Sequence, residues 1–388
     1  MITRLEVDGF KSLRGFAIDL APFTALIGPN SAGKSNILEA LALLSHLASE
    51  PVEAAFKHGR GRAIDQFTLE KGEPVREIRF AVELLLPVDV AAGDGETTNR
   101  VRYELTIGRE RRASGAETLV IRHERLSTIG AEQDERRLGV SGGQSFLRAL
   151  SATWTALAAA KMAVDVSPAE GLTAGELGAT RLVQLDTARL RDESERIGGA
   201  TLAPDASNLP TVLASLSPRD LGEIRADLVA LVPGISTLDV VADKDSFRIE
   251  IELSGGERLP ARLVSDGTLR ALALLTALRS RPSPSIIAIE EPENGIYPGR
   301  LRTLLDLLRE ASSSGAQVII TSHSPVVLAA MRDDLPGLRF IDTVRRDGHL
   351  VTRARRVGPA APGSRGQQTV PLREVDALLS LATSEAAE

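Results

Sequence analysis

The chain of 388 residues contains no cysteine, which excludes disulfide bonds, thiolate metal ligands and cysteine catalysis. It also lacks an uninterrupted apolar run of the roughly 18 residues that a membrane span needs, and its start has no apolar signal core. We therefore expect a cytoplasmic protein with no membrane partner. The net charge of −6 argues against a strongly electropositive nucleic-acid binder, although it leaves room for a local basic patch.

Lysine is scarce as well, with only six in a chain rich in arginine, and one of them stands in a glycine-rich motif. An apolar run over 23–27 precedes this motif, and apolar residues at helical spacing follow it. The pattern predicts a loop between a buried strand and a helix, where backbone N–H groups, a lysine ammonium and a serine hydroxyl bind nucleotide phosphates and Mg²⁺. A glycine-rich turn before an ordinary helix is the alternative. The expected nucleotide contacts are Gly28, Pro29, Asn30, Ser31, Ala32, Gly33, Lys34, Ser35 and Asn36, with Ser35 also a Mg²⁺ ligand.

Two adjacent carboxylates, Glu290 and Glu291, end a second apolar run over 285–289. Such a run predicts a strand buried on both faces, as in a parallel sheet between helices. Two neighbouring negative charges at its end are unfavourable unless a cation stands there, and Mg²⁺ bound to ATP is the obvious one. We expect Glu290 to bind the Mg²⁺ and Glu291 to orient or deprotonate the attacking water. A solvated acidic turn is the alternative.

A third apolar run, over 317–320, ends in polar residues that include His323. Open α/β sheets bind ligands at the carboxyl ends of their strands, so His323 is expected to contact the γ-phosphate or the attacking water. A further candidate is the turn Ser265, Asp266, Gly267 and Thr268, which precedes leucines at helical spacing. A capped helix start of small residues can bind an anion, although many ordinary helices begin in the same way.

The rest of the sequence predicts how the chain divides into domains. Strands are predicted over 77–86, 100–107 and 118–124 as an inserted antiparallel sheet, and residues 51–75 are predicted to be loop. A helical lobe is expected next, with one apolar face formed by Leu147, Leu150, Trp154 and Leu157. The predicted domains are a bipartite core over 1–75 and 236–358, a β-rich insertion over 76–140, a helical lobe over 141–235, and a linker with a short terminal helix over 359–388.

The ordered motifs GPNSAGKS, SDGT, IIAIEEPENG and TSHSP resemble those of ABC-type ATPase heads of the RecF/SMC class. They are most similar to the compact bacterial AAA-family ATPases related to the OLD proteins. The resemblance implies an α/β P-loop NTPase fold with a parallel or mixed core sheet, an inserted antiparallel β lobe and a helical lobe. It also implies that Lys11, in the opening strand and turn, reaches the nucleotide, that Glu291 is the general base, and that His323 is the γ-phosphate switch. Residues 265–268 would contact the ATP held by a second copy, giving a homodimer that encloses ATP.

Two positions depart from the pattern of this class. Glu290 stands where aspartate is usual, and Tyr297 stands where related sequences often have histidine. The resemblance implies Mg²⁺-dependent ATP hydrolysis coupled to a separately encoded effector, a nuclease or toxin, or to DNA, in phage defence or DNA repair. Two alternatives stay open. One is a self-sufficient ATP-dependent nuclease using Asp243 and Asp245, and the other is an ATP-gated DNA clamp. The clamp would use five late arginines: Arg345, Arg346, Arg353, Arg355 and Arg356.

Overall fold

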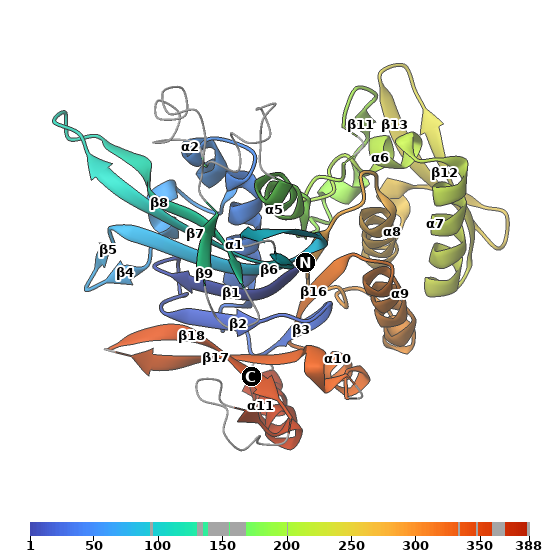
Figure 1. Ribbon diagram of the computed structural model, residues 1–388. Coiled ribbons are helices and arrows are strands. Elements are labelled where there is room, and N and C mark those ends of the chain that lie inside the picture. Colours follow the sequence, from blue (N-terminus) through green and yellow to red (C-terminus); the bar gives the residue numbers. More distant parts are fainter. Residues whose placement is uncertain are drawn as a thin grey trace. The chain divides into compact units, whose positions relative to one another are not determined.

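The computed structural model describes residues 1–93, 96–129, 135–138, 155, 168–199, 201–332, 334–346, 348–358 and 369–385 (Figure 1). The chain forms two compact units. Unit 1 comprises Met1–Thr180 and Leu335–Glu388, and unit 2 comprises Arg181–Asp334. No helix in the described part of the chain has the length and apolar character needed to cross a membrane.

Unit 1 contains a six-stranded antiparallel sheet in the order β2-β1-β6-β7-β8-β9. In β1 the buried Leu5 and Val7 alternate with less buried residues, and a register shift between Ile2 and Arg4 separates them from the buried Ile2. The inserted strands form an antiparallel sheet as predicted, and β6 pairs along β1, so this sheet also includes the N-terminal hairpin. They are also longer than predicted, because register shifts let β6 and β7 stay paired beyond Leu85. The bounds are β1 Ile2–Asp8, β2 Phe16–Asp19, β6 Glu77–Gly93, β7 Glu96–Arg111, β8 Glu117–Ile129 and β9 Glu135–Leu138.

The strand, loop and helix predicted around the glycine-rich motif are present in the same unit. All five residues of β3 (Phe23–Ile27) are buried, and β17 (Leu338–Arg346) pairs with it in parallel. β17 forms an antiparallel hairpin with β18 (His349–Val357), which pairs with β19 (Thr369–Val370) before α11 (Leu372–Glu385). Helix α1 (Lys34–Leu47) begins directly after the loop. The late strands β17 and β18 therefore lie beside β3 and the phosphate loop.

Residues 51–75 contain short helices and a hairpin, where the sequence predicted a loop. These elements are α2 Val52–Ala55, the 3-10 turns η1 Phe56–His58 and η2 Ala63–Gln66, and the strands β4 Leu69–Glu70 and β5 Glu73–Pro74. The buried side chains of Phe56 and Phe67 stack with ring centroids 5.9 Å apart and hold this segment in place. Helix α5 (Pro168–Gly178) and strand β10 (Thr180–Val183) follow later in the chain. The predicted apolar face of Leu147, Leu150, Trp154 and Leu157, and the predicted linker at 359–368, lie outside the described residues.

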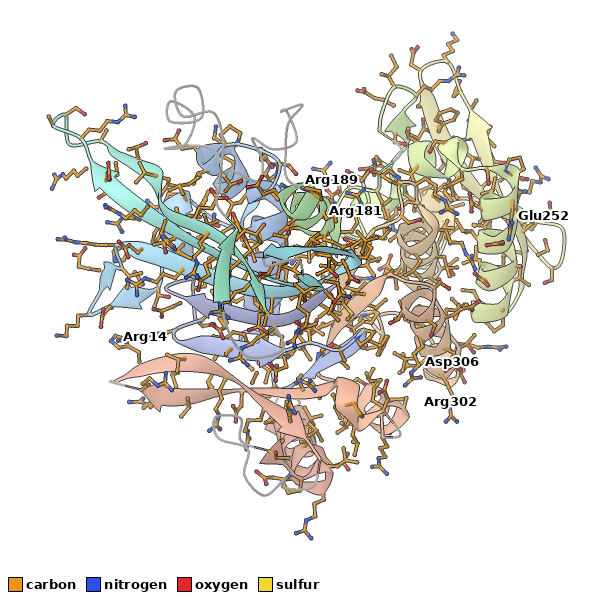
Figure 2. All side chains as sticks on the ribbon, in the orientation of Figure 1. Arg14, Arg181, Arg189, Glu252, Arg302 and Asp306 are labelled. Carbon is orange, nitrogen blue, oxygen red and sulfur yellow. The ribbon has the colours of Figure 1, made fainter. Side chains whose placement is uncertain are left out.

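Unit 2 combines helices, a parallel strand pair and a small antiparallel sheet. Strands β15 (Ile286–Glu290) and β16 (Gln317–Ser322) are parallel, and their apolar residues are buried, as the sequence predicted. Helix α7 (Pro218–Leu231) packs against α8 (Asp266–Arg279) and also contacts α9 (Leu301–Ser313) (Figure 1). Arg302 and Asp306, four residues apart, project from the exposed face of α9 (Figure 2), opposite its buried leucines.

The small sheet includes the hairpin predicted around Asp243, formed by β12 (Ile235–Ala242) and β13 (Ser246–Leu253). β11 (Ser194–Glu195) and β14 (Arg258–Pro260) also pair with β13. The remaining short elements are η3 Arg189–Arg191, α6 Leu209–Ser215, η4 Ala261–Leu263, η5 Pro298–Arg300, α10 Pro325–Ala330 and η6 Leu335–Gly337. The domain boundaries predicted at residues 75, 140, 235 and 358 stay predictions.

Candidate nucleotide-binding and catalytic site

The phosphate loop is shaped by the close approach of β18. Gly33 has φ of 96°, in the left-handed region, and a Cβ atom there would lie 2.0 Å from Oγ1 of Thr352. Only glycine fits this position, because any side chain would collide with the strand behind the loop. Ser31 also has a positive φ, of 62°, so the loop makes two left-handed turns within three residues.

A chain of hydrogen bonds holds this loop from behind. Thr352 Oγ1 lies 3.0 Å from the carbonyl oxygen of Ala32 and 2.6 Å from Ser12 Oγ. Asn36 Nδ2, in the first turn of α1, donates to the same Ser12 oxygen at 2.7 Å. Thr352 is 3% exposed, so these bonds are sheltered from water. Sequence reasoning missed Thr352 because it is 320 residues from the loop and belongs to no motif.

The start of α1 has the features of an anion site. Gly33 is the N-cap and offers no side-chain cap, and no acidic residue stands in the first turn. Backbone N–H groups in the first turn of a helix are the groups that bind phosphate oxygens at such a site. The Lys34 ammonium is buried and donates to the carbonyl oxygens of Gly28 at 2.7 Å and Pro29 at 2.8 Å. These hydrogen bonds hold the Lys34 ammonium at the loop, where it can bind a phosphate. Ser35 is the next residue of the helix.

Lys11, the other predicted nucleotide contact in unit 1, lies against the side of α1. Its Nζ forms an ion pair with Glu39, whose other carboxyl oxygen lies 3.4 Å from Arg60 Nε. Lys11 has φ of 48°, and its backbone N–H donates to the carbonyl oxygen of Gln66 at 3.0 Å. The turn that follows β1 is thereby tied to helix α1. The nucleotide role of Lys11 stays a prediction.

In unit 2, the ends of β15 and β16 bring the predicted catalytic residues together. Glu290 pairs in register with Thr321, and Glu291 follows with φ of 46°. The Glu291 carboxylate is bonded on both sides, with Oε1 2.8 Å from His323 Nδ1 and Oε2 2.7 Å from Asn294 Nδ2. A non-glycine residue at positive φ stores strain and is typical of functional sites. The carboxylate is thus held in one orientation beside the histidine.

A second glutamate, which the sequence analysis did not single out, lies next to this pair. Glu293 Oε1 accepts a hydrogen bond from Ser322 Oγ, and that hydroxyl also accepts from the Ser324 N–H at 3.0 Å. Among the described residues, Oε2 of Glu293 is buried and has no hydrogen-bond partner. Burial raises the pKa of Glu293, against the opposing effect of the Ser322 hydrogen bond. The side chain joins the loop after β15 to the loop that carries His323.

The turn at residues 265–268 is a capped helix start, as predicted. Ser265 Oγ accepts from the Thr268 N–H at 3.3 Å. Asp266 is paired with Arg191, which also donates to the carbonyl oxygens of Arg262 at 2.8 Å and Val264 at 2.9 Å. Arg191 thus neutralises the acidic charge at the turn, a role that no sequence motif indicated.

Gly267 packs against the loop that carries Asn294. A Cβ atom at Gly267 would lie 1.8 Å from the carbonyl oxygen of Gly295, so the turn and that loop touch backbone to backbone. Tyr297, two residues further along, is 71% exposed. The start of α8 and the loop after β15 are therefore one packed surface within unit 2.

Several residues named for the two alternative functions, the nuclease and the DNA clamp, form ion pairs within the chain. Asp243 is exposed and lies 3.5 Å from Arg248, and within the described residues no group of three or more potential metal ligands includes it or Asp245. Asp342 pairs with Arg353 at 2.7 Å and Arg355 at 2.8 Å, and Asp19 pairs with Arg356 at 2.6 Å. Arg345 and Arg346 are exposed.

Two family models match separate segments of the chain. Residues 182–329 match a family model described as an AAA domain, in a description that also names the AbiEii toxin and type IV TA systems. Residues 1–82 match the AAA ATPase domain model. The DNA replication and repair protein RecF of Beutenbergia cavernae is 29% identical over 142 residues, which cover 35% of this chain and 33% of RecF. Over these segments the chain is similar to AAA ATPase domains and to RecF.

Other relatives of this ATPase domain match over shorter segments. Structural maintenance of chromosomes protein 1 of Schizosaccharomyces pombe is 42% identical over 66 residues, covering 15% of this chain and 5% of that protein. The OLD nuclease of Thermus scotoductus is 46% identical over 44 residues, covering 11% of this chain and 8% of the nuclease. The chain therefore matches a third or less of the length of each of these three relatives.

Solved structures show the fold. The Smc head bound to the C-terminal winged-helix domain of ScpA superposes with a TM-score of 0.55 at 16% identity, covering 91% of this chain and 97% of the head. The Pyrococcus yayanosii Smc head with its coiled coil and joint gives a TM-score of 0.53 at 13% identity, covering 98% and 99%. The predicted P-loop NTPase fold with an SMC-type head is thus confirmed.

Proposed function

We propose that this ATPase domain binds ATP with Mg²⁺ at the phosphate loop and hydrolyses it with the help of the residues that follow β15 and β16. The observation that carries the proposal is the double support of the Glu291 carboxylate by His323 and Asn294. A general base must be oriented toward its water, and a carboxylate bonded on both oxygens at a strained backbone position meets that need.

Each residue has a defined task in this proposal. The N–H groups at the start of α1 and the Lys34 ammonium bind the phosphates. Ser35 and Glu290 would hold Mg²⁺, which when bound neutralises charge on the β- and γ-phosphate oxygens. Glu291 accepts the proton of the attacking water, and His323 keeps the carboxylate in place. Glu290 reaches further than an aspartate would, which fits a Mg²⁺ held at the end of the strand.

We further propose that a second copy of the chain completes the site through residues 265–268. Ser265 and Asp266 are exposed at the start of a 14-residue helix, where a partner's phosphate can approach. Arg191 supports this role because it offsets the negative charge of Asp266. The backbone contact between Gly267 and Gly295 would pass the state of one nucleotide to the loop next to Glu291.

The partner of this ATPase is proposed to be a separately encoded effector, a nuclease or toxin, in phage defence or DNA repair. The family description that names the AbiEii toxin supports the defence role, and the similarity to RecF supports repair. DNA is a second candidate partner, for which the exposed Arg345 and Arg346 supply positive charge.

The test compares Glu291→Gln with Glu257→Gln, which makes the same change on an exposed turn. We expect Glu291→Gln to lower ATP turnover by at least about 100-fold, the loss typical of removing a general base, and Glu257→Gln to leave it unchanged. Light scattering after size-exclusion chromatography should show Glu291→Gln as a dimer with ATP and a monomer without it. Wild-type turnover in Glu291→Gln would refute the catalytic assignment, and a monomer at saturating ATP would refute the dimer.

A further inference from the structure

Two histidines and a glutamate lie close together at the C-terminal end of helix α1, away from the phosphate loop at its start. His46 lies in the last turn of α1, Glu50 follows four residues later, and His58 ends η1. Among the described residues they form the one group of three potential metal ligands whose donor atoms all lie within 4.8 Å of one another. From this geometry we propose that His46, Glu50 and His58 bind a divalent transition-metal ion of the zinc type.

The local fold explains why the three side chains converge. The Glu50 N–H donates to the His46 carbonyl oxygen at 2.9 Å, so the backbone continues one more helical turn and places both side chains on the same face. The His58 ring is brought back over His46 by the 3-10 turn, which is fixed by the fully buried Phe56. The two imidazole rings stack with centroids 3.9 Å apart and planes 4° from parallel.

The donor atoms have spacing suited to one ion. Glu50 Oε1 lies 2.6 Å from His46 Nδ1 and 3.1 Å from His58 Nε2. Two ligands bound at about 2.0–2.1 Å to a tetrahedral ion stand roughly 3.3 Å apart. The Glu50–His46 pair must therefore widen, and the two rings must turn out of their parallel stack until both lone pairs point at the ion. Two imidazoles and one carboxylate are a recognised ligand set for Zn²⁺, and the half-exposed His58 leaves room for water as a fourth ligand.

The charges also favour an ion. A metal binds neutral imidazole, and the Glu50 carboxylate beside the two rings would balance part of the charge of a divalent ion. The ion would fasten the end of α1 to η1 and so stiffen the helix whose start forms the phosphate loop.

The experiment uses the untagged full chain, because a histidine tag would itself bind zinc. After removal of metal with a chelator and exhaustive dialysis, Zn²⁺ is titrated calorimetrically without nucleotide, and Co²⁺ is used as a visible spectroscopic probe. We expect one Zn²⁺ per chain. His58→Ala and Glu50→Gln should weaken binding at least about tenfold, by analogy with losses seen on disturbing metal sites. The matched control His349→Ala removes a histidine from the β18 strand and should bind as wild type does.

Thermal unfolding gives a second readout that does not depend on ATP hydrolysis. Zn²⁺ should raise the midpoint of wild type and His349→Ala but not that of His58→Ala. Glu290→Gln should retain the zinc, which separates this site from the Mg²⁺ position of the ATPase. Failure of the wild-type chain to bind Zn²⁺, or equal affinity in His58→Ala and His349→Ala, would overturn the proposal whatever the outcome at Glu291.

Discussion

Replacing Thr352 with valine tests whether β18 holds the phosphate loop in its shape. Valine has nearly the shape of threonine but no hydroxyl, so Thr352→Val removes the contacts to the Ala32 carbonyl at 3.0 Å and to Ser12 Oγ at 2.6 Å. Packing is preserved, and the Asn36 hydrogen bond to Ser12 at 2.7 Å can remain. The change therefore isolates the polar connection between the strand and the loop.

The size of the effect expected for Thr352→Val follows from the burial of Thr352. Thr352 is 3% exposed, so the Ala32 carbonyl cannot easily replace its lost partner with water. Leaving a buried polar group unsatisfied costs about 1–3 kcal/mol. If the loop opens more readily by that amount, the opening equilibrium rises about 5- to 150-fold, since each 1.4 kcal/mol is a factor of ten.

Hydrogen exchange of a peptide covering residues 28–36 measures this opening directly. A local method is preferable because a chain of two compact units need not unfold in one step. The matched control is Thr343→Val, since Thr343 stands directly opposite Thr352 in the β17–β18 hairpin but is exposed. Exchange in 28–36 should accelerate in Thr352→Val and stay at the wild-type rate in Thr343→Val.

Identical exchange in the two variants would show that Thr352 does not restrain the loop. The Gly33 turn would then be held by α1 and β3 alone. Slower exchange in Thr352→Val would contradict the reasoning more strongly, because it would mean that the hydroxyl strains the loop.

Two further predictions concern unit 2. Gly267→Ala should lower the free energy of unfolding by about 1–3 kcal/mol, because the added Cβ would lie 1.8 Å from the Gly295 carbonyl oxygen. The control is Gly222→Ala in α7, where a Cβ meets nothing within 4 Å, and it should raise the free energy of unfolding by up to about 1 kcal/mol. Urea denaturation monitors both, and a Gly267→Ala variant as stable as wild type would contradict the close packing. Because burial raises the pKa of Glu293, the folded state favours its protonated carboxyl. The stability that this form contributes is fully present below the unfolded pKa near 4.5 and is lost as the pH rises through the raised pKa of the folded state. Glu293→Gln should therefore gain stability relative to wild type as the pH rises above that unfolded value, and parallel stability–pH curves for the two proteins would refute this.

Local signals in the sequence identified the elements on which the site is built. The apolar runs before Gly28, Glu290 and His323 each form a buried strand, because a strand covered on both faces requires apolar residues at every position. The cap formed by Ser265 also follows from local chemistry, since a serine hydroxyl before a helix can satisfy the N–H group three residues later. These features depend on neighbours within a few residues.

Contacts between distant residues could not be predicted in this way. Thr352 behind the loop, Arg191 against Asp266 and Glu293 beside Ser322 have no motif, because their partners lie 29 to 320 residues away along the chain. The same holds for His46 and His58. Their spacing in the sequence is not that of a metal-binding motif, and the 3-10 turn brings their rings together.

The sequence by itself determined the fold class and the order of the nucleotide motifs in this ATPase domain, because strand burial and helix capping depend on residues close together in the chain. Only the tertiary structure decided which side chains hold those motifs in place, since that depends on how distant strands and loops pack. The merging of the inserted strands with β1 shows the difference, because alternation identifies a strand but not its neighbour in the sheet.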